Sequence, residues 1–252
     1  MTSLLSESGA WAGVLGAVFL AGLLRGFTGF GFALAAVPLA SLVLPPSRAV
    51  PMVILLQLCL GLRDGIAERR RADRFSVGWV AAGCVLGTPL GVAALAALPQ
   101  PVVRLVLGVI VGVAVLATWH GPGRPLERRR GLAMLAGLAS GVCNGLAAMG
   151  GPPVILYFLA VEPVQAVMRS SLLVYFALAA VIALPGTLAA GLIDAPLLAA
   201  AAAGVPVVLA GSWIGGWGFR HAGHRCYRMV AAGVLLVTAL ATIIRGIAGL
   251  SG

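Results

Sequence analysis

Long apolar stretches alternate with short polar ones along almost the whole of this 252-residue chain. Stretches of about 18 or more apolar residues are typical of transmembrane helices. The pattern therefore predicts an all-α polytopic membrane protein with about eight transmembrane segments, forming a single membrane domain over residues 1–252. The segments are expected at about residues 9–44, 49–67, 75–98, 102–119, 131–160, 163–184, 196–218 and 227–247.

Two of these segments have lengths that suit neither one membrane crossing nor two. As single helices, residues 9–44 would extend roughly 54 Å and residues 131–160 roughly 45 Å, against a hydrocarbon core of about 30 Å. Each contains a run of helix breakers, GFTGFGFALAAVP from Gly26 to Pro38 and GVCNGLAAMGGPP from Gly141 to Pro153. We expect a broken or re-entrant helix in each segment, with the prolines at the start of its second part.

The two runs of breakers belong to an internal duplication of about 120 residues. They align without a gap at an offset of 115 residues, and further on PPSRAV (45–50) matches EPVQAV (162–167). The duplication divides the chain into a first repeat (1–120), a linker (121–130) and a second repeat (131–252).

Charge is sparse and unevenly placed. The chain is 61% hydrophobic and 10% charged, carries a net charge of +10, and has arginine as its only cationic residue apart from histidine. A nucleic-acid partner is not expected, because the arginines lie in short loops between apolar segments. They gather in the connection 68–74 of the first half but one connection later, at 220–228, in the second. Since cytoplasmic loops carry the excess of arginine, we expect two inverted repeats in a bacterial inner membrane, with a cytoplasmic linker and a periplasmic N-terminus.

The broken segments suit ligand binding. Non-helical backbone persists at membrane depth only where protein or a water-lined cavity covers it. The helix that begins beyond each break presents free N–H groups, which attract anions. Two breaks related by a pseudo-twofold axis would direct these donors at one site near the midplane. The other interpretation is that the glycines only permit close helix packing.

Polar side chains near the breaks complete the candidate substrate site. Arg169 and Arg25 carry guanidinium groups that fit an oxyanion. The alternatives are a position at the membrane interface or, for Arg169, a pair with Glu162. An interhelical hydrogen bond explains Gln57 equally well. The full candidate set is Thr28, Gly29, Gly31, Asn144, Gly150, Gly151, Pro152, Arg169, Ser170, Tyr157, Arg25 and Gln57.

Several functions are not expected. No acidic residue lies in the middle of a predicted span, and no serine has a histidine at membrane depth. We therefore expect no metal site, carboxylate proton relay or hydrolase active site, and no cofactor or enzymatic activity. The expected partners are a small anionic substrate and the lipid bilayer. A homodimer is compatible with the sequence, although no interface is evident in it.

The paired motifs RGFTGFGFALAAVPL and NGLAAMGGPPVILYFL are each followed by a short turn and a helix, beginning RAVPMVILL and QAVMRSSLL. Together they resemble the sulfite exporter TauE/SafE family of bacterial membrane proteins over nearly the whole chain. The resemblance implies transport of small sulfur-containing oxyanions such as sulfite, sulfoacetate and other organosulfonates, and it alone supplies the export direction. We expect a secondary transporter that works by alternating access. A passive anion channel or facilitator, and a transporter of another small organic anion, are the alternatives.

Overall fold

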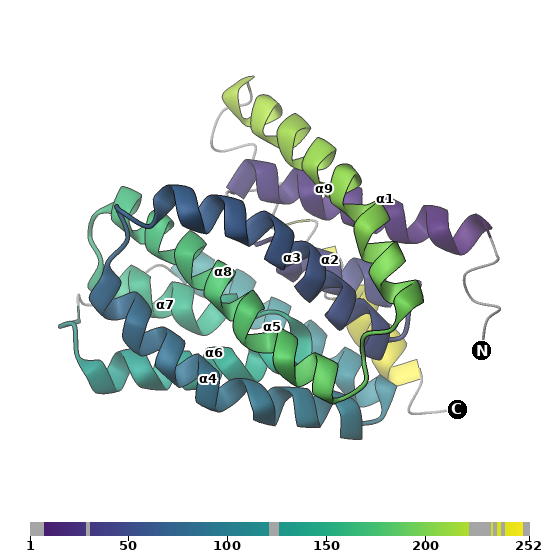
Figure 1. Ribbon diagram of the computed structural model, residues 1–252, viewed down its shortest axis with the longest axis horizontal. Coiled ribbons are helices and arrows are strands. Elements are labelled where there is room, and N and C mark those ends of the chain that lie inside the picture. Colours follow the sequence, from purple (N-terminus) through teal and green to yellow (C-terminus); the bar gives the residue numbers. More distant parts are fainter. Residues whose placement is uncertain are drawn as a thin grey trace.

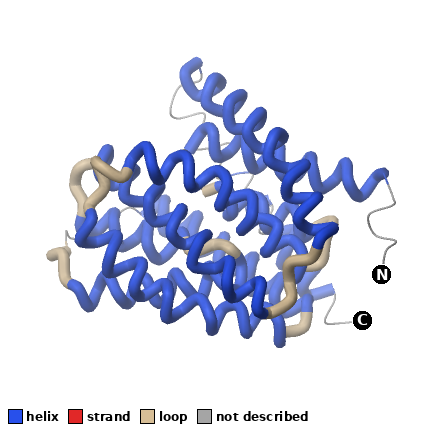
Figure 2. The backbone as a smooth tube through the Cα atoms, viewed as in Figure 1, coloured by secondary structure: helices blue, strands red, loops and turns tan. Residues whose placement is uncertain are grey.

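The computed structural model describes residues 8–28, 31–120, 126–221, 233, 236–237 and 240–248. Within these ranges every regular element is a helix, and most connections lie at two opposite ends of the molecule (Figure 2). Residues 240–248 are helical, and the labelled helices are α1 (Ser8–Thr28), α2 (Phe32–Ser41), α3 (Pro46–Glu68), α4 (Arg74–Ala97), α5 (Gln100–His120), α6 (Arg130–Ala147), α7 (Gly151–Val161), α8 (Gln165–Ala189) and α9 (Ala195–His221). The all-α prediction is confirmed.

Four helices in the described part are long and apolar enough to cross a membrane, namely Pro46–Glu68, Arg74–Ala97, Gln165–Ala189 and Ala195–Gly218. Shorter apolar helices occupy Ala12–Gly26, Phe32–Ser41, Gln100–Ala114 and Gly151–Val161. This composition agrees with a polytopic membrane protein. Of the predicted segment 227–247, residues 227–232, 234–235 and 238–239 lie outside the described residues.

Both long segments are broken, as predicted. In the first, Gly31 separates α1 from α2. It is the residue just before α2 and its φ of 90° lies in the left-handed region. In the second, α6 ends at Ala148, which also has a positive φ, 54°. Ala148 N–H donates to the carbonyl of Asn144 at 2.7 Å. The turn therefore supplies a hydrogen bond to one of the carbonyl groups that the end of α6 would otherwise leave without a partner.

The second part of each broken segment turns back along the first. Beyond the end of α2, Val43 lies beside Gly13 of α1, where a Cβ on the glycine would come within 3.1 Å of its side chain. Leu126, just before α6, donates its backbone N–H to the carbonyl of Ala160 near the end of α7 at 2.8 Å. Each broken segment therefore folds back on itself as a helical hairpin, and in the second one Ala148 and Met149 at the turn are buried.

The prolines only partly follow the prediction. Pro152 and Pro153 lie in the first turn of α7, where a missing N–H costs no intrahelical bond. Pro38, however, lies inside α2, so its expected place at a helix start is wrong: the left-handed Gly31 already makes the break. The span predicted to end before Pro185 also continues through it, to the end of α8. One proline removes one backbone hydrogen bond, which a buried membrane helix tolerates.

Two glycine-lined helix pairs flank the centre of the fold. Figure 1 shows α1 with α9 along one side, α4 with α6 along the opposite side, and α3 and α8 between them. A Cβ at Gly87 of α4 would lie 2.2 Å from the backbone oxygen of Leu138 on α6, and one at Gly26 of α1 would lie 2.0 Å from that of Ser212 on α9. The helix backbones are in direct contact at these glycines. This agrees with the interpretation that glycines in this chain permit close helix packing.

The contacts fix how the helices run. Along α4 and α6 the facing residues advance together, so these helices are parallel, and the same holds for α1 and α9. On α3, Gly61 faces Ala177 of α8, while Gly65, further along, also approaches Val174, which comes earlier in α8. The two central helices therefore run in opposite directions, as Figure 1 also shows.

The helix starts suggest a register for the predicted repeats that differs from the sequence alignment. α2 and α7 begin 119 residues apart, as do α3 and α8, whereas the alignment paired the runs of breakers at 115 and PPSRAV with EPVQAV at 117. At 119, Gly22 and Gly26 of α1 correspond to Gly141 and Gly145 of α6, and all four are packing glycines. Glycines recur there every four residues, about one turn, so a shift of one turn matches glycine to glycine equally well.

Candidate anion-binding site

The two helix breaks line one cavity, which we call the inner cavity. It contains about 520 Å³ of empty space, open solvent included. The first break contributes Gly31, Phe32, Ala33 and Leu34, and the second contributes Ala148, Met149 and Gly151. The remaining lining residues are Arg25, Gln57, Leu60, Gly61, Ile155, Leu173 and Phe176.

Two helices begin at the inner cavity. The N-terminus of α2 brings the free N–H groups of its first turn, and the positive end of the helix dipole lies there. The N-terminus of α7 brings fewer donors, because Pro152 and Pro153 have no N–H. The backbone contribution to anion binding is therefore larger from the first break than from the second.

Two polar side chains line the inner cavity among apolar ones. Arg25 is almost buried, with 11% of its side chain exposed. The side-chain oxygen of Gln57 is buried and has no hydrogen-bond partner. This unpartnered oxygen is an acceptor, which water or a donor group of a ligand can complete, whereas the NH₂ group of the same amide is the part that can donate to an anion. One fixed cation and one amide in apolar surroundings suit a small anion with an apolar or weakly polar body.

A second cavity adjoins the first, and we call it the vestibule. Its lining is Arg25, Gly26, Asp64, Ala67, Glu68, Arg169, Leu173 and Ser212, so it shares Arg25 and Leu173 with the inner cavity. Arg169 is exposed here rather than at the helix breaks. Ser170 lies beside the vestibule, where its hydroxyl donates to Glu68 at 2.7 Å.

Arg25 forms an ion pair with Asp64 of α3, whose side chain is 34% exposed. Sequence reasoning missed Asp64 because it lies towards the end of its span. A signal was present, since Gln57, Gly61, Asp64 and Glu68 recur at the spacing of one face of a helix. This stripe on α3 leads from the inner cavity to the vestibule. Asp64 is thus a carboxylate at the site, although it lies near the end of α3 and not in the middle of the span.

Several other candidate residues lie outside the lining of both cavities. Asn144 is buried and donates to the carbonyl of Ala179 at 2.8 Å, which ties α6 to α8. Gly150 accepts a hydrogen bond from the Ser140 hydroxyl and adjoins the lining through Gly151. Tyr157 bonds Ser76 instead. Thr28 is the last residue of α1, while its side chain and Gly29 fall outside the described residues.

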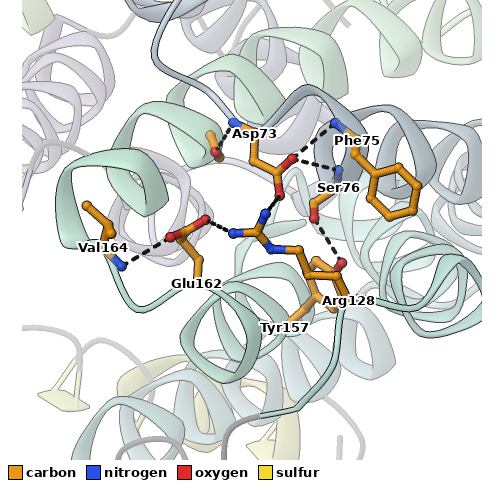
Figure 3. Close-up of polar contacts among 8 residues, drawn as sticks. Asp73, Phe75, Ser76, Arg128, Tyr157, Glu162 and Val164 are labelled. Atoms are coloured by element: carbon orange, nitrogen blue, oxygen red, sulfur yellow. Dashed lines mark hydrogen bonds and ion pairs between the residues drawn. The ribbon is translucent and has the colours of Figure 1, made fainter.

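An ionic cluster joins the start of α4, the segment before α6 and the end of α7, and Figure 3 shows its members. Arg128, just before α6, pairs with Glu162 at the end of α7 and lies 3.7 Å from a carboxylate oxygen of Asp73. Asp73 caps α4 by accepting the N–H of Phe75 at 3.1 Å. Glu162 is therefore the partner of Arg128, and the alternative that paired it with Arg169 is wrong.

Comparison with known protein families finds one that matches most of the chain. The model of the family described as Sulfite exporter TauE/SafE matches residues 14–242. The chain belongs to the sulfite exporter TauE/SafE family. Comparisons with curated proteins and with solved structures returned no match. Membership of TauE/SafE identifies the chain as a membrane protein of a transporter family, not an enzyme family.

Proposed function

We propose that this chain is a secondary transporter, working as an exporter, for small sulfur-containing oxyanions such as sulfite, sulfoacetate or other organosulfonates. The family supports export of a sulfur anion. The observation that carries the proposal is the inner cavity, which two helix breaks and the guanidinium of Arg25 line together. A guanidinium and a helix N-terminus both donate to oxyanions, and the apolar remainder accepts a short carbon chain.

Alternating access between inverted halves is the mechanism we propose. Matching helices of the two halves run in opposite directions, as α3 and α8 do, and the glycine contacts repeat in reciprocal pairs, α1 on α9 and α6 on α4. Inverted repeats of this kind rock about a fixed site in several transporters. The cluster of arginines at 69–71 favours a cytoplasmic end for the α3–α4 connection. We infer an inner-membrane location with the N-terminus in the periplasm.

A panel of anions tests the proposed site. Purified wild type is heated in detergent with sulfite, sulfoacetate, methanesulfonate, taurine or sulfate, and the shift of its melting temperature is recorded. Gly151→Ala is the site variant, because a Cβ there would touch Ile155 and Phe176, both lining the inner cavity, at 3.5 Å. Gly16→Ala is the matched control, since nothing lies within 4 Å of its new methyl group.

We expect at least one sulfur anion to raise the melting temperature of wild type and of Gly16→Ala equally. Gly151→Ala should need several-fold more anion for the same shift, because its methyl group occupies part of the inner cavity. The assignment fails if no sulfur anion stabilises the protein, or if Gly151→Ala responds as wild type does.

A further inference from the structure

Gln57 is a polar side chain in a mostly apolar cavity. It lies on α3 and lines the inner cavity, yet its side-chain oxygen is buried and accepts no hydrogen bond from the described residues. This oxygen therefore does not form the interhelical hydrogen bond that the sequence also allowed. Leu60 and Gly61, one turn further along α3, line the same cavity and offer no side-chain donor. A buried acceptor of this kind is costly until a donor completes it.

The corresponding position on α8 is aromatic. Gln57 and Phe176 lie equally far from the starts of α3 and α8, and both line the inner cavity. The ring of Phe176 lies against the second break, where a Cβ on Gly151 would come within 3.5 Å of it. The predicted second repeat contributes apolar lining residues, whereas the first contributes the guanidinium of Arg25 and the amide of Gln57. The polar groups of a ligand therefore find their partners on the first repeat.

Arg25 and the oxygen of Gln57 require different groups on a ligand. The guanidinium only donates, so it suits the oxygens of an acid group. Its described hydrogen bond to Asp64 comes from Nη2 and uses only one of the several N–H donors that a guanidinium carries. The oxygen of Gln57 only accepts, so an ionised acid group cannot complete it. A ligand that satisfies both groups has an oxyanion and, separately, an O–H group.

We propose that the inner cavity selects organosulfonates that carry a hydroxyl group, and that Gln57 recognises this hydroxyl. The sulfonate binds Arg25 and the N-terminus of α2, the hydroxyl donates to the oxygen of Gln57, and the carbon atoms contact the apolar lining at Phe176. The simplest such ligand is 2-hydroxyethanesulfonate. This selection rests on the proposed function and narrows its substrate class.

The order of two affinities distinguishes recognition of the hydroxyl from simple filling of the cavity. Propane-1-sulfonate has nearly the shape of 2-hydroxyethanesulfonate, with a methyl group in place of the hydroxyl. In an apolar site without an acceptor the propane compound binds more tightly, because burying an unpaired O–H group is costly. With Gln57 as the acceptor the order reverses, because the propane compound leaves the oxygen of Gln57 unpaired and displaces water that could complete it.

Calorimetric titration of purified protein in detergent with each of these two sulfonates tests the selection. Gln57→Met removes the amide and keeps an unbranched side chain, and Gln57→Leu is a second variant that also removes it. Gln165→Met is the matched control, because it makes the same change at an exposed glutamine that lines neither cavity.

We expect wild type and Gln165→Met to bind 2-hydroxyethanesulfonate about tenfold more tightly than propane-1-sulfonate. Gln57→Met and Gln57→Leu should bind the propane compound at least as tightly as the hydroxyl compound. The wild-type order alone can refute the selection, even if both variants at Gln57 fail to fold.

The outcomes separate the selection from the transport function. Wild type that binds the two sulfonates equally, or the propane compound more tightly, refutes the selection and leaves the proposed function standing. A preference for the hydroxyl compound that persists in the Gln57 variants, or is also lost in Gln165→Met, refutes it too, because Gln57 is then not the group that recognises the hydroxyl. Wild type that binds neither sulfonate contradicts the proposed organosulfonate site and the selection with it.

Discussion

Replacing Gly87 of α4 with alanine should separate two helices that are in backbone contact. The new Cβ would lie 2.2 Å from the oxygen of Leu138 and 3.0 Å from the nitrogen of Val142 on α6. Ordinary contacts of this kind are about 3.5 Å, so the helices must move apart by roughly 1 Å. Neither atom can rotate away, because both belong to the backbone. Overpacking of this kind costs about 3 kcal/mol, and the better helix propensity of alanine returns about 1 kcal/mol.

The net expectation is a loss of about 2 kcal/mol in the free energy of unfolding. Gly78→Ala on the same helix is the control, because nothing lies within 4 Å of its new methyl group. It should match wild type or gain up to about 1 kcal/mol. Unfolding of both variants is measured side by side in the same mild detergent, using a denaturant. If Gly87→Ala is as stable as Gly78→Ala, α4 and α6 do not pack through their glycines.

Three further changes test the rest of the fold. Arg128→Ala should lower the free energy of unfolding by about 2 kcal/mol in denaturant melts, because it leaves two carboxylates that are 9% and 3% exposed without their cation; wild-type stability would contradict the ionic cluster. Gly31→Ala should lose about 1–2 kcal/mol in the same assay, because its φ of 90° strains any residue with a Cβ. The hydrogen bond from Arg48 lowers the pKa of Asp194 below the usual aspartate value of about 3.9. The pair therefore stabilises the folded state above that pH, and the stabilisation is lost as the pH falls through the lowered pKa. Melting temperatures of wild type and Asp194→Asn should therefore converge in acid, and a constant difference would argue against the pair.

The breaks in the helices were predictable because their causes are local. Gly31 lies in a glycine-rich run, and two consecutive prolines such as Pro152 and Pro153 are best tolerated in the first turn of a helix. Length added a second, independent indication, since neither broken segment fits one crossing of the membrane. The position of the break within each run was less certain, because the left-handed turn at Ala148 uses a residue with no special preference for it.

The long-range partners were not predictable from local pattern. Asn144 and Tyr157 are hydrogen-bonding residues near a break, yet each bonds across to another helix, at Ala179 and Ser76. Arg25 was identified as a candidate, but its partner lies 39 positions away on α3. Spacing along one helix can indicate which residues share a face, whereas the neighbouring helix that meets this face depends on tertiary packing.

Counterflow in proteoliposomes tests the central claim most directly. Vesicles containing the wild-type protein and loaded with unlabelled sulfite or sulfoacetate are diluted into a trace of the same labelled anion. A carrier with one site at the two helix breaks should accumulate label transiently, with saturation, and Gly151→Ala should reduce this accumulation while Gly16→Ala does not. Label that only equilibrates, at a rate linear in concentration, would identify a passive channel, and equal accumulation by both variants would place the site elsewhere.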